Sequence, residues 1–94
     1  MEGMFIDCES LENINTKIFR ENKIENLNYV FSYCTSLKEL DLSHFDTKYI
    51  TELKSTFRNC KSLEKINFTN FNNSKVEIMD YMFYNCESLT YFDL

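Results

Sequence analysis

FSYCTSLKELDLSHF, residues 31–45, decides the fold of this 94-residue chain, because the remaining sequence repeats its pattern. When the sequence is shifted against itself by 26 residues, the same residue types align without insertion or deletion. The aligned columns are Phe5/Phe31/Phe57/Phe83, Cys8/Cys34/Cys60/Cys86, Ser10/Ser36/Ser62/Ser88 and Leu11/Leu37/Leu63/Leu89. A fixed period of this length predicts a solenoid in which each 26-residue unit forms one coil.

The period divides one predicted domain, residues 1–94, into units. Three full units span 8–33, 34–59 and 60–85, and partial units cover 1–7 and 86–94. Each end of such a stack exposes one side of its core. We therefore expect either further coils in a longer parent or self-association through the open ends.

Two periodicities alternate within a unit. Leu40 and Leu42 alternate with polar residues, which predicts a short half-buried strand. Ile50, Leu53 and Phe57 recur at steps of three and four, which predicts one face of a helix. The predicted fold class is therefore an α/β solenoid: a right-handed stack with a short parallel sheet on the concave face and helices on the convex face.

Composition narrows the function classes. The net charge of -5 argues against a nucleic-acid partner, since phosphate binding needs a basic surface. The chain contains no run of about 18 apolar residues that could span a membrane. Its first residues, from Met1 to Phe5, do not have the pattern of a signal peptide.

The spacing Leu37-x-x-Leu40-x-Leu42 is similar to a leucine-rich repeat. The longer pattern from Phe31 to Thr47, with Cys34 and Ser36 before Leu37, resembles the BspA-like surface leucine-rich repeats. The first unit departs from that pattern, with Asn15-Thr16 where the family has Asp-Leu. The resemblance implies a leucine-rich-repeat fold, an extracellular or cell-surface location, a role in adhesion or partner contact, and no catalytic residues.

The four cysteines do not have the spacing of a metal site. They recur every 26 residues, without a Cys-x-x-Cys pair, and so form a line rather than a converging cluster. We expect a column of packed thiols, with disulfides between neighbouring coils as the alternative. Asp41 and Asp93 lie two coils apart, about 10 Å by strand spacing, which is too far for a shared metal. A hydrogen-bonded Asn/Asp ladder along the sheet is expected instead, and a weak calcium site at Asn15 and Asp41 is the alternative.

We therefore predict a non-enzymatic module, without cofactor or metal, that binds a protein or a glycan. The predicted binding residues are the outward-pointing strand residues of the concave face: Glu39, Asp41, Lys65, Asn67, Tyr91 and Asp93. The alternative function is a purely structural spacer within a larger surface protein. An enzyme is the least favoured class, because His44 is the only histidine and no nucleophile lies at motif spacing from it.

Overall fold

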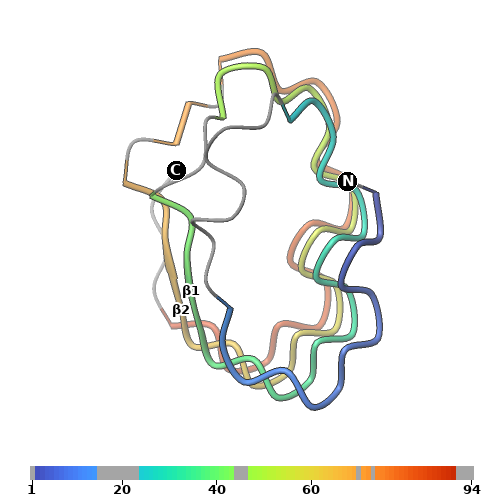
Figure 1. Cartoon of the computed structure of the whole chain (residues 1–94), viewed down its shortest axis with the longest axis vertical. Helices are drawn as coiled ribbons and strands as arrows, with labels where there is room; N and C mark the ends of the chain where they lie inside the picture. The colour runs from blue at the N-terminus through green and yellow to red at the C-terminus, as the bar shows by residue number, and fades with distance from the viewer. Residues whose placement is uncertain (1, 15–23, 44–46, 70, 73, 91–94) are drawn as a thin grey trace.

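The computed structural model describes residues 2–14, 24–43, 47–69, 71–72 and 74–90. The chain runs in successive coils, and a view down the stack shows their traces nearly superposed (Figure 1). Residues 26 apart lie side by side in neighbouring coils. Strand β1 (Glu39–Asp41) pairs in parallel with strand β2 (Lys65–Asn67), and Asn26, Glu52 and Ile78 form two further parallel bridges.

Both strands are three residues long, and each buries only its central residue. Leu40 and Ile66 face the core, whereas the residues on either side of them are exposed. A carboxylate or amide ends each strand by accepting a hydrogen bond from the backbone two residues on. Asp41 Oδ1 accepts from the N–H of Ser43 at 2.9 Å, and Asn67 Oδ1 accepts from the N–H of Thr69 at 2.9 Å. Such side-chain turns compete with the strand ladder and keep the strands short.

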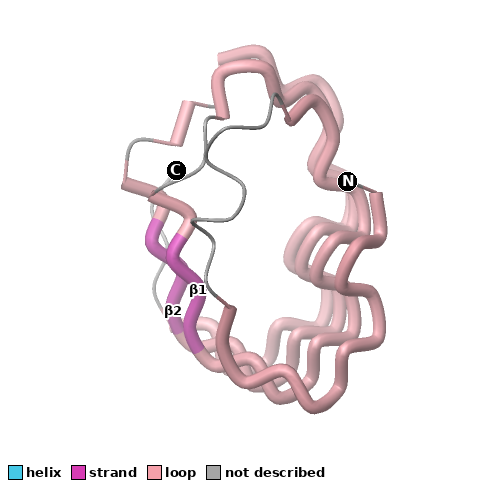
Figure 2. The backbone as a smooth tube through the Cα atoms, in the orientation of Figure 1, coloured by secondary structure: helices cyan, strands magenta, loops and turns pink. Residues whose placement is uncertain are grey.

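The predicted α/β solenoid is wrong, because the described residues contain no helix (Figure 2). Ile50, Leu53 and Phe57 do face the core, but they lie in turns and irregular backbone instead of on a convex-face helix. The structure is a compact body of 28 × 25 × 23 Å with one two-stranded parallel sheet among the described residues. It is not a leucine-rich-repeat solenoid with helices.

A series of linked turns occupies the place of the predicted helix. The N–H groups of Val30 and Ser32 donate to carbonyls three residues earlier, at 3.2 and 3.1 Å. The N–H groups that alternate with them point elsewhere: Tyr29 and Phe31 donate across to the next coil, each at 3.0 Å. An α-helix needs every N–H directed four residues back, so this alternation excludes it. We call these segments the turn ribbons; they comprise residues 3–8, 27–34, 53–60 and 79–86.

Left-handed backbone recurs at every fourth residue of the ribbons. Two columns, 26 residues apart along the chain, have φ between 53 and 65°: Gly3/Tyr29/Ser55/Tyr81 and Asp7/Tyr33/Asn59/Asn85. A positive φ at the third position is what a type II turn requires. Gly, Asn and Asp tolerate this conformation best. Their presence in these columns was the sequence signal for turns, and the apolar spacing of three and four residues concealed it.

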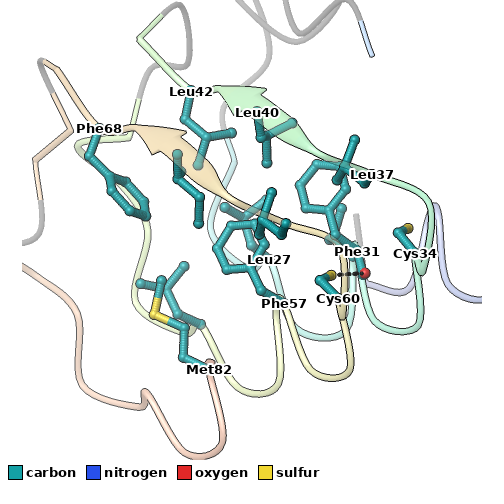
Figure 3. Close-up of a cluster of buried hydrophobic side chains, with 14 of the residues drawn as sticks. Leu27, Phe31, Cys34, Leu37, Leu40, Leu42, Phe57, Cys60, Phe68 and Met82 are labelled. Atoms are coloured by element: carbon teal, nitrogen blue, oxygen red, sulfur yellow. Dashed lines mark hydrogen bonds between the residues drawn. The ribbon is translucent and has the colours of Figure 1, made fainter. Parts of the chain in front are cut away.

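The core is built from the same columns. Phe31 and Phe57 are fully buried, and their parallel rings lie 5.7 Å apart between centroids. Phe5 and Phe83 extend this column at 5.7 and 5.6 Å. Leu40 of β1, with Leu37 before the strand and Leu42 after it, closes the other side of the core (Figure 3).

Ser55 gives a test of the ribbon geometry. It has φ of 53°, and among the described residues its buried hydroxyl has no hydrogen-bond partner. Gly3 occupies the same column. We expect Ser55→Gly to raise the free energy of unfolding by about 1 kcal/mol, because it removes both left-handed strain and an unsatisfied hydroxyl. Urea titration measures the change. Thr56→Gly, one residue on, lacks the positive φ and should destabilise; a similar loss in Ser55→Gly would contradict the assigned turns.

Candidate functional site

The exposed face of the sheet carries a hollow. Its volume is about 410 Å³, and it is open to solvent. The described residues that line it are polar, except for Ile14 and Leu40: Asn13, Ile14, Glu39, Leu40, Asp41, Lys65 and Asn67. Four of the six predicted binding residues therefore surround one feature.

The parallel register determines the charge pattern of this hollow. Glu39 lies directly opposite Lys65, and Asp41 lies opposite Asn67. Neighbouring strands lie about 4.8 Å apart, so opposite charges are side by side at one end of the strands. At the other end, a carboxylate and an amide are side by side. The face therefore carries positive and negative charges, and hydrogen-bond donors and acceptors, within a small area.

The other predicted positions are not placed by the structure. Tyr91 and Asp93 lie outside the described residues, as do Asn15 of the alternative calcium site and His44. Their assignment to the binding face stays a prediction.

Asp41 and Asn67 each form a local turn at the end of a strand, and the expected ladder of Asn and Asp side chains along the sheet stays a prediction. Each directs Oδ1 to its own chain two residues on, and Asp41 also accepts from the Ser43 hydroxyl at 2.6 Å. Local turns of this kind are a common use of Asp and Asn side chains. These two side chains therefore fix the backbone turns at the rim of the hollow.

A second surface was missed in the sequence. The guanidinium of Arg58 lies over the rings of Tyr81 and Tyr84, with its carbon 5.8 and 5.2 Å from the two centroids. The two rings meet edge to face at 5.6 Å. The assumption of a helix separated these residues, whereas Arg58 and Tyr84 occupy the same column of the turn ribbons. Their 26-residue spacing was the available signal.

The cysteines form a column of free thiols, three of which donate hydrogen bonds to the backbone. Cys34, Cys60 and Cys86 donate from Sγ to the carbonyl oxygens of Phe5, Phe31 and Phe57, at 3.2, 3.0 and 3.0 Å. All four cysteines are free. Burial raises the pKa of Cys34 and of Cys86 to about 11, and it raises the pKa of Cys60 further. A thiol with a raised pKa is a poor nucleophile and a poor metal ligand at neutral pH.

Neither a cluster of metal-ligating side chains nor a membrane-spanning helix lies in the described ranges. No group of three or more His, Cys, Asp or Glu side chains is placed to hold a metal ion. Within the same ranges, no helix is long and apolar enough to cross a bilayer. The predicted lack of a metal and of a cofactor stays a prediction.

Comparison with known proteins corrects the predicted family. A family model described as "Mycoplasma protein of unknown function, DUF285" matches residues 1–92. The resemblance to BspA-like surface leucine-rich repeats is therefore wrong, together with the leucine-rich-repeat description that followed from it. The Leu-x-x-Leu-x-Leu spacing records which side chains enter the core, and different coiled architectures share that requirement. No curated protein and no solved structure matches the chain.

Proposed function

Because the chain belongs to the DUF285 family, we propose a function from the chain's own surface: non-enzymatic binding of a polar protein or glycan at the strand face. The observation that carries this proposal is the hollow of about 410 Å³, which Glu39, Asp41, Lys65 and Asn67 line together.

The chemistry of the hollow favours a polar ligand. The carboxylates of Glu39 and Asp41 accept hydrogen bonds from hydroxyl or amide groups, while Lys65 donates and Asn67 can do both. Ile14 and Leu40 add an apolar part to the lining. The volume is near the lower end of ligand pockets, about 300–1,000 Å³, so it suits one residue of a glycan or the tip of one side chain. The net charge of -5 supports neither a nucleic acid nor an anionic membrane as the partner.

The short strands explain why the surface can be specific. Register in a parallel pair fixes which side chains are adjacent, so the mixed charge pattern is held by backbone pairing. Binding then requires little reordering of the site, which lowers its entropic cost.

An exchange of charges tests the proposal. In the double variant Glu39→Lys/Lys65→Glu, the net charge and the opposite-charge pair are kept, but every ligand contact at that end reverses in sign. Like-charge juxtaposition in a binding site costs several kcal/mol, so we expect at least a tenfold loss of binding, about 1.4 kcal/mol or more. Immobilised chain would be probed with a glycan array and with a biotin-labelled extract of cell-surface proteins.

The matched control is Lys38→Glu/Glu64→Lys. These residues are also exposed and are hydrogen-bonded neighbours, since the N–H of Glu64 donates to the carbonyl of Lys38 at 2.8 Å. They do not line the hollow. Binding that survives the control but not the first exchange supports the strand face. If both variants bind the ligand equally well, the binding site lies elsewhere. If the unaltered chain binds nothing, the alternative of a structural spacer is favoured.

The location outside the cell or at its surface was predicted only from the resemblance to BspA-like repeats, which the family match has corrected. As a proposal it is tested by labelling intact cells with a membrane-impermeant biotin reagent. Labelling only after lysis would contradict it.

A further inference from the structure

We propose that the strand face of this chain binds the strand face of a second copy, in a dimer with two-fold symmetry. The strand face is the exposed side of β1 and β2, which carries Glu39, Asp41, Lys65 and Asn67 (Figure 2). This inference rests on the proposed function, because it names the polar protein that the face binds. β1 and β2 belong to inner coils of the stack, so the face is independent of the two ends of the chain.

The two strands carry complementary groups at the same level. Glu39 of β1 lies opposite Lys65 of β2, and Asp41 of β1 lies opposite Asn67 of β2. At both levels β1 supplies a carboxylate, and β2 supplies an ammonium or an amide that can donate a hydrogen bond to it. The exposed side of β1 is therefore the acceptor side of the face, and that of β2 is the donor side.

A two-fold axis between the copies turns this arrangement into self-complementarity. If the axis runs parallel to the strands and midway between them, it places β1 of one copy over β2 of the other at the same level. Glu39 then meets Lys65 of the second copy, and Asp41 meets Asn67 of the second copy. Because a two-fold contact is made of the same patch on both copies, each of these contacts occurs twice.

The side chains are available for these contacts. All four are exposed, and no ion pair joins Glu39 to Lys65 within one copy in the part of the chain that the structure describes. Asn67 uses Oδ1 for the turn at Thr69, so its amide nitrogen supplies the donors. A carboxylate accepts several hydrogen bonds, and Asp41 can therefore accept from the second copy in addition to Ser43.

The charge pattern selects this dimer over the alternatives. A two-fold axis across the strands would place Glu39 over Asp41 of the second copy, and like charges in such positions repel. A neutral glycan would pair neither the charge of Glu39 nor that of Lys65, whereas a second copy pairs both. The face is thus complementary to itself in one orientation.

The dimer should be weak and sensitive to salt. Each strand is three residues long, so the contact is small and polar, and exposed ion pairs contribute little. We expect a dissociation constant on the order of 0.1–1 mM, as for small transient interfaces. Because the contacts join opposite charges, salt screens an attraction, and association should weaken as the salt concentration rises.

Sedimentation equilibrium of the whole chain tests the proposal, from about 10 µM to about 2 mM protein in about 0.02 M NaCl. The average mass should rise toward that of a dimer and not beyond it. Glu39→Lys places like charges in contact and should weaken association at least tenfold, although it makes the chain less negative. Glu77→Lys is the matched control: it changes the net charge equally at an exposed position that does not line the hollow, and it should not weaken association.

A pair of complementary variants tests the register. Lys65→Glu alone should also weaken association at least tenfold, because it places carboxylates in contact. An equimolar mixture of Glu39→Lys and Lys65→Glu should restore the dimer, since every lysine at that level then meets a glutamate. This recovery would also show that both variants are folded. A mixture of Glu77→Lys and Lys65→Glu has the same net charges but one repulsive contact, and should associate less.

The outcomes separate this dimer from the proposed function. The exchange Glu39→Lys/Lys65→Glu should associate with itself as the unaltered chain does, but not with the unaltered chain, whereas any other ligand of the face is lost. A monomer at every concentration, growth beyond a dimer, equal loss in Glu77→Lys or a mixture without recovery would overturn the dimer. Retention of a glycan or surface protein by a monomeric chain would reject the dimer and keep the proposed function.

Discussion

Phe57→Ala should lower the free energy of unfolding by about 3–5 kcal/mol, the cost of truncating a buried aromatic side chain in a packed core. Phe57 is fully buried, and its ring lies between those of Phe31 and Phe83, at 5.7 and 5.6 Å. Phe68 meets it edge to face at 6.4 Å. Removal of this ring leaves a cavity bordered by three coils. Small domains have a total stability of about 5–15 kcal/mol, so the variant should be close to unfolding.

Urea titration followed by circular dichroism measures this loss. Tyr84→Ala is the control, since it removes an aromatic ring of similar size from an exposed site where it contacts Arg58. Its cost should be about 1 kcal/mol or less, the contribution of an exposed cation–π contact. A Phe57→Ala variant as stable as Tyr84→Ala would show that the rings do not form the centre of the core.

Alkaline pH should destabilise the chain through its buried thiols. Burial raises the pKa of Cys34 from 9.0 to about 11 and raises that of Cys60 further. Above pH 9 the unfolded chain loses these protons while the folded chain keeps them, so the unfolded state binds fewer protons and stability falls as pH rises. Each such thiol contributes at most about 1.4 kcal/mol per pH unit, and less close to its unfolded or folded pKa. We expect a loss of about 4 kcal/mol from these two thiols between about pH 9 and pH 11.

Cys60→Ser separates this effect from the titration of other groups. The serine hydroxyl can donate to the carbonyl of Phe31, as the Cys60 thiol does at 3.0 Å, but it does not ionise in this range. Unfolding of both proteins in urea, with a reductant present, should show a shallower alkaline slope for Cys60→Ser. The same slope in both would mean that the Cys60 thiol is not protected in the folded state.

The sequence indicates neighbours in this protein better than it indicates backbone conformation. The 26-residue spacing brings Glu39 beside Lys65 and Phe31 over Phe57, and the structure pairs them. Leu40 and Ile66 each alternate with polar neighbours in their own segment, and this pattern correctly predicts two short strands. Apolar steps of three and four residues, however, suit a helix and a chain of turns equally, because both direct every third or fourth side chain inward. The choice between them depends on left-handed residues such as Asn59 and Asn85, whose column also contains a tyrosine that obscures the signal.

The candidate site was predictable to the extent that it depends on strands. Glu39, Asp41, Lys65 and Asn67 follow from alternation alone, since a half-buried strand must expose them. The hollow itself was not predictable, because its shape depends on Asn13 and Ile14 of the preceding coil. The Arg58, Tyr81 and Tyr84 cluster was missed because a helical period places those side chains differently around the axis.

Nuclear magnetic resonance of residues 53–60 tests most directly whether stacked turns form this fold. The structure predicts ring contacts between Phe31 and Phe57, backbone couplings that report positive φ at Ser55 and Asn59, and no continuous run of helical Cα shifts across this segment. A continuous helical run over 53–60, or an absence of contacts between the two rings, would contradict the fold and the surfaces assigned from it.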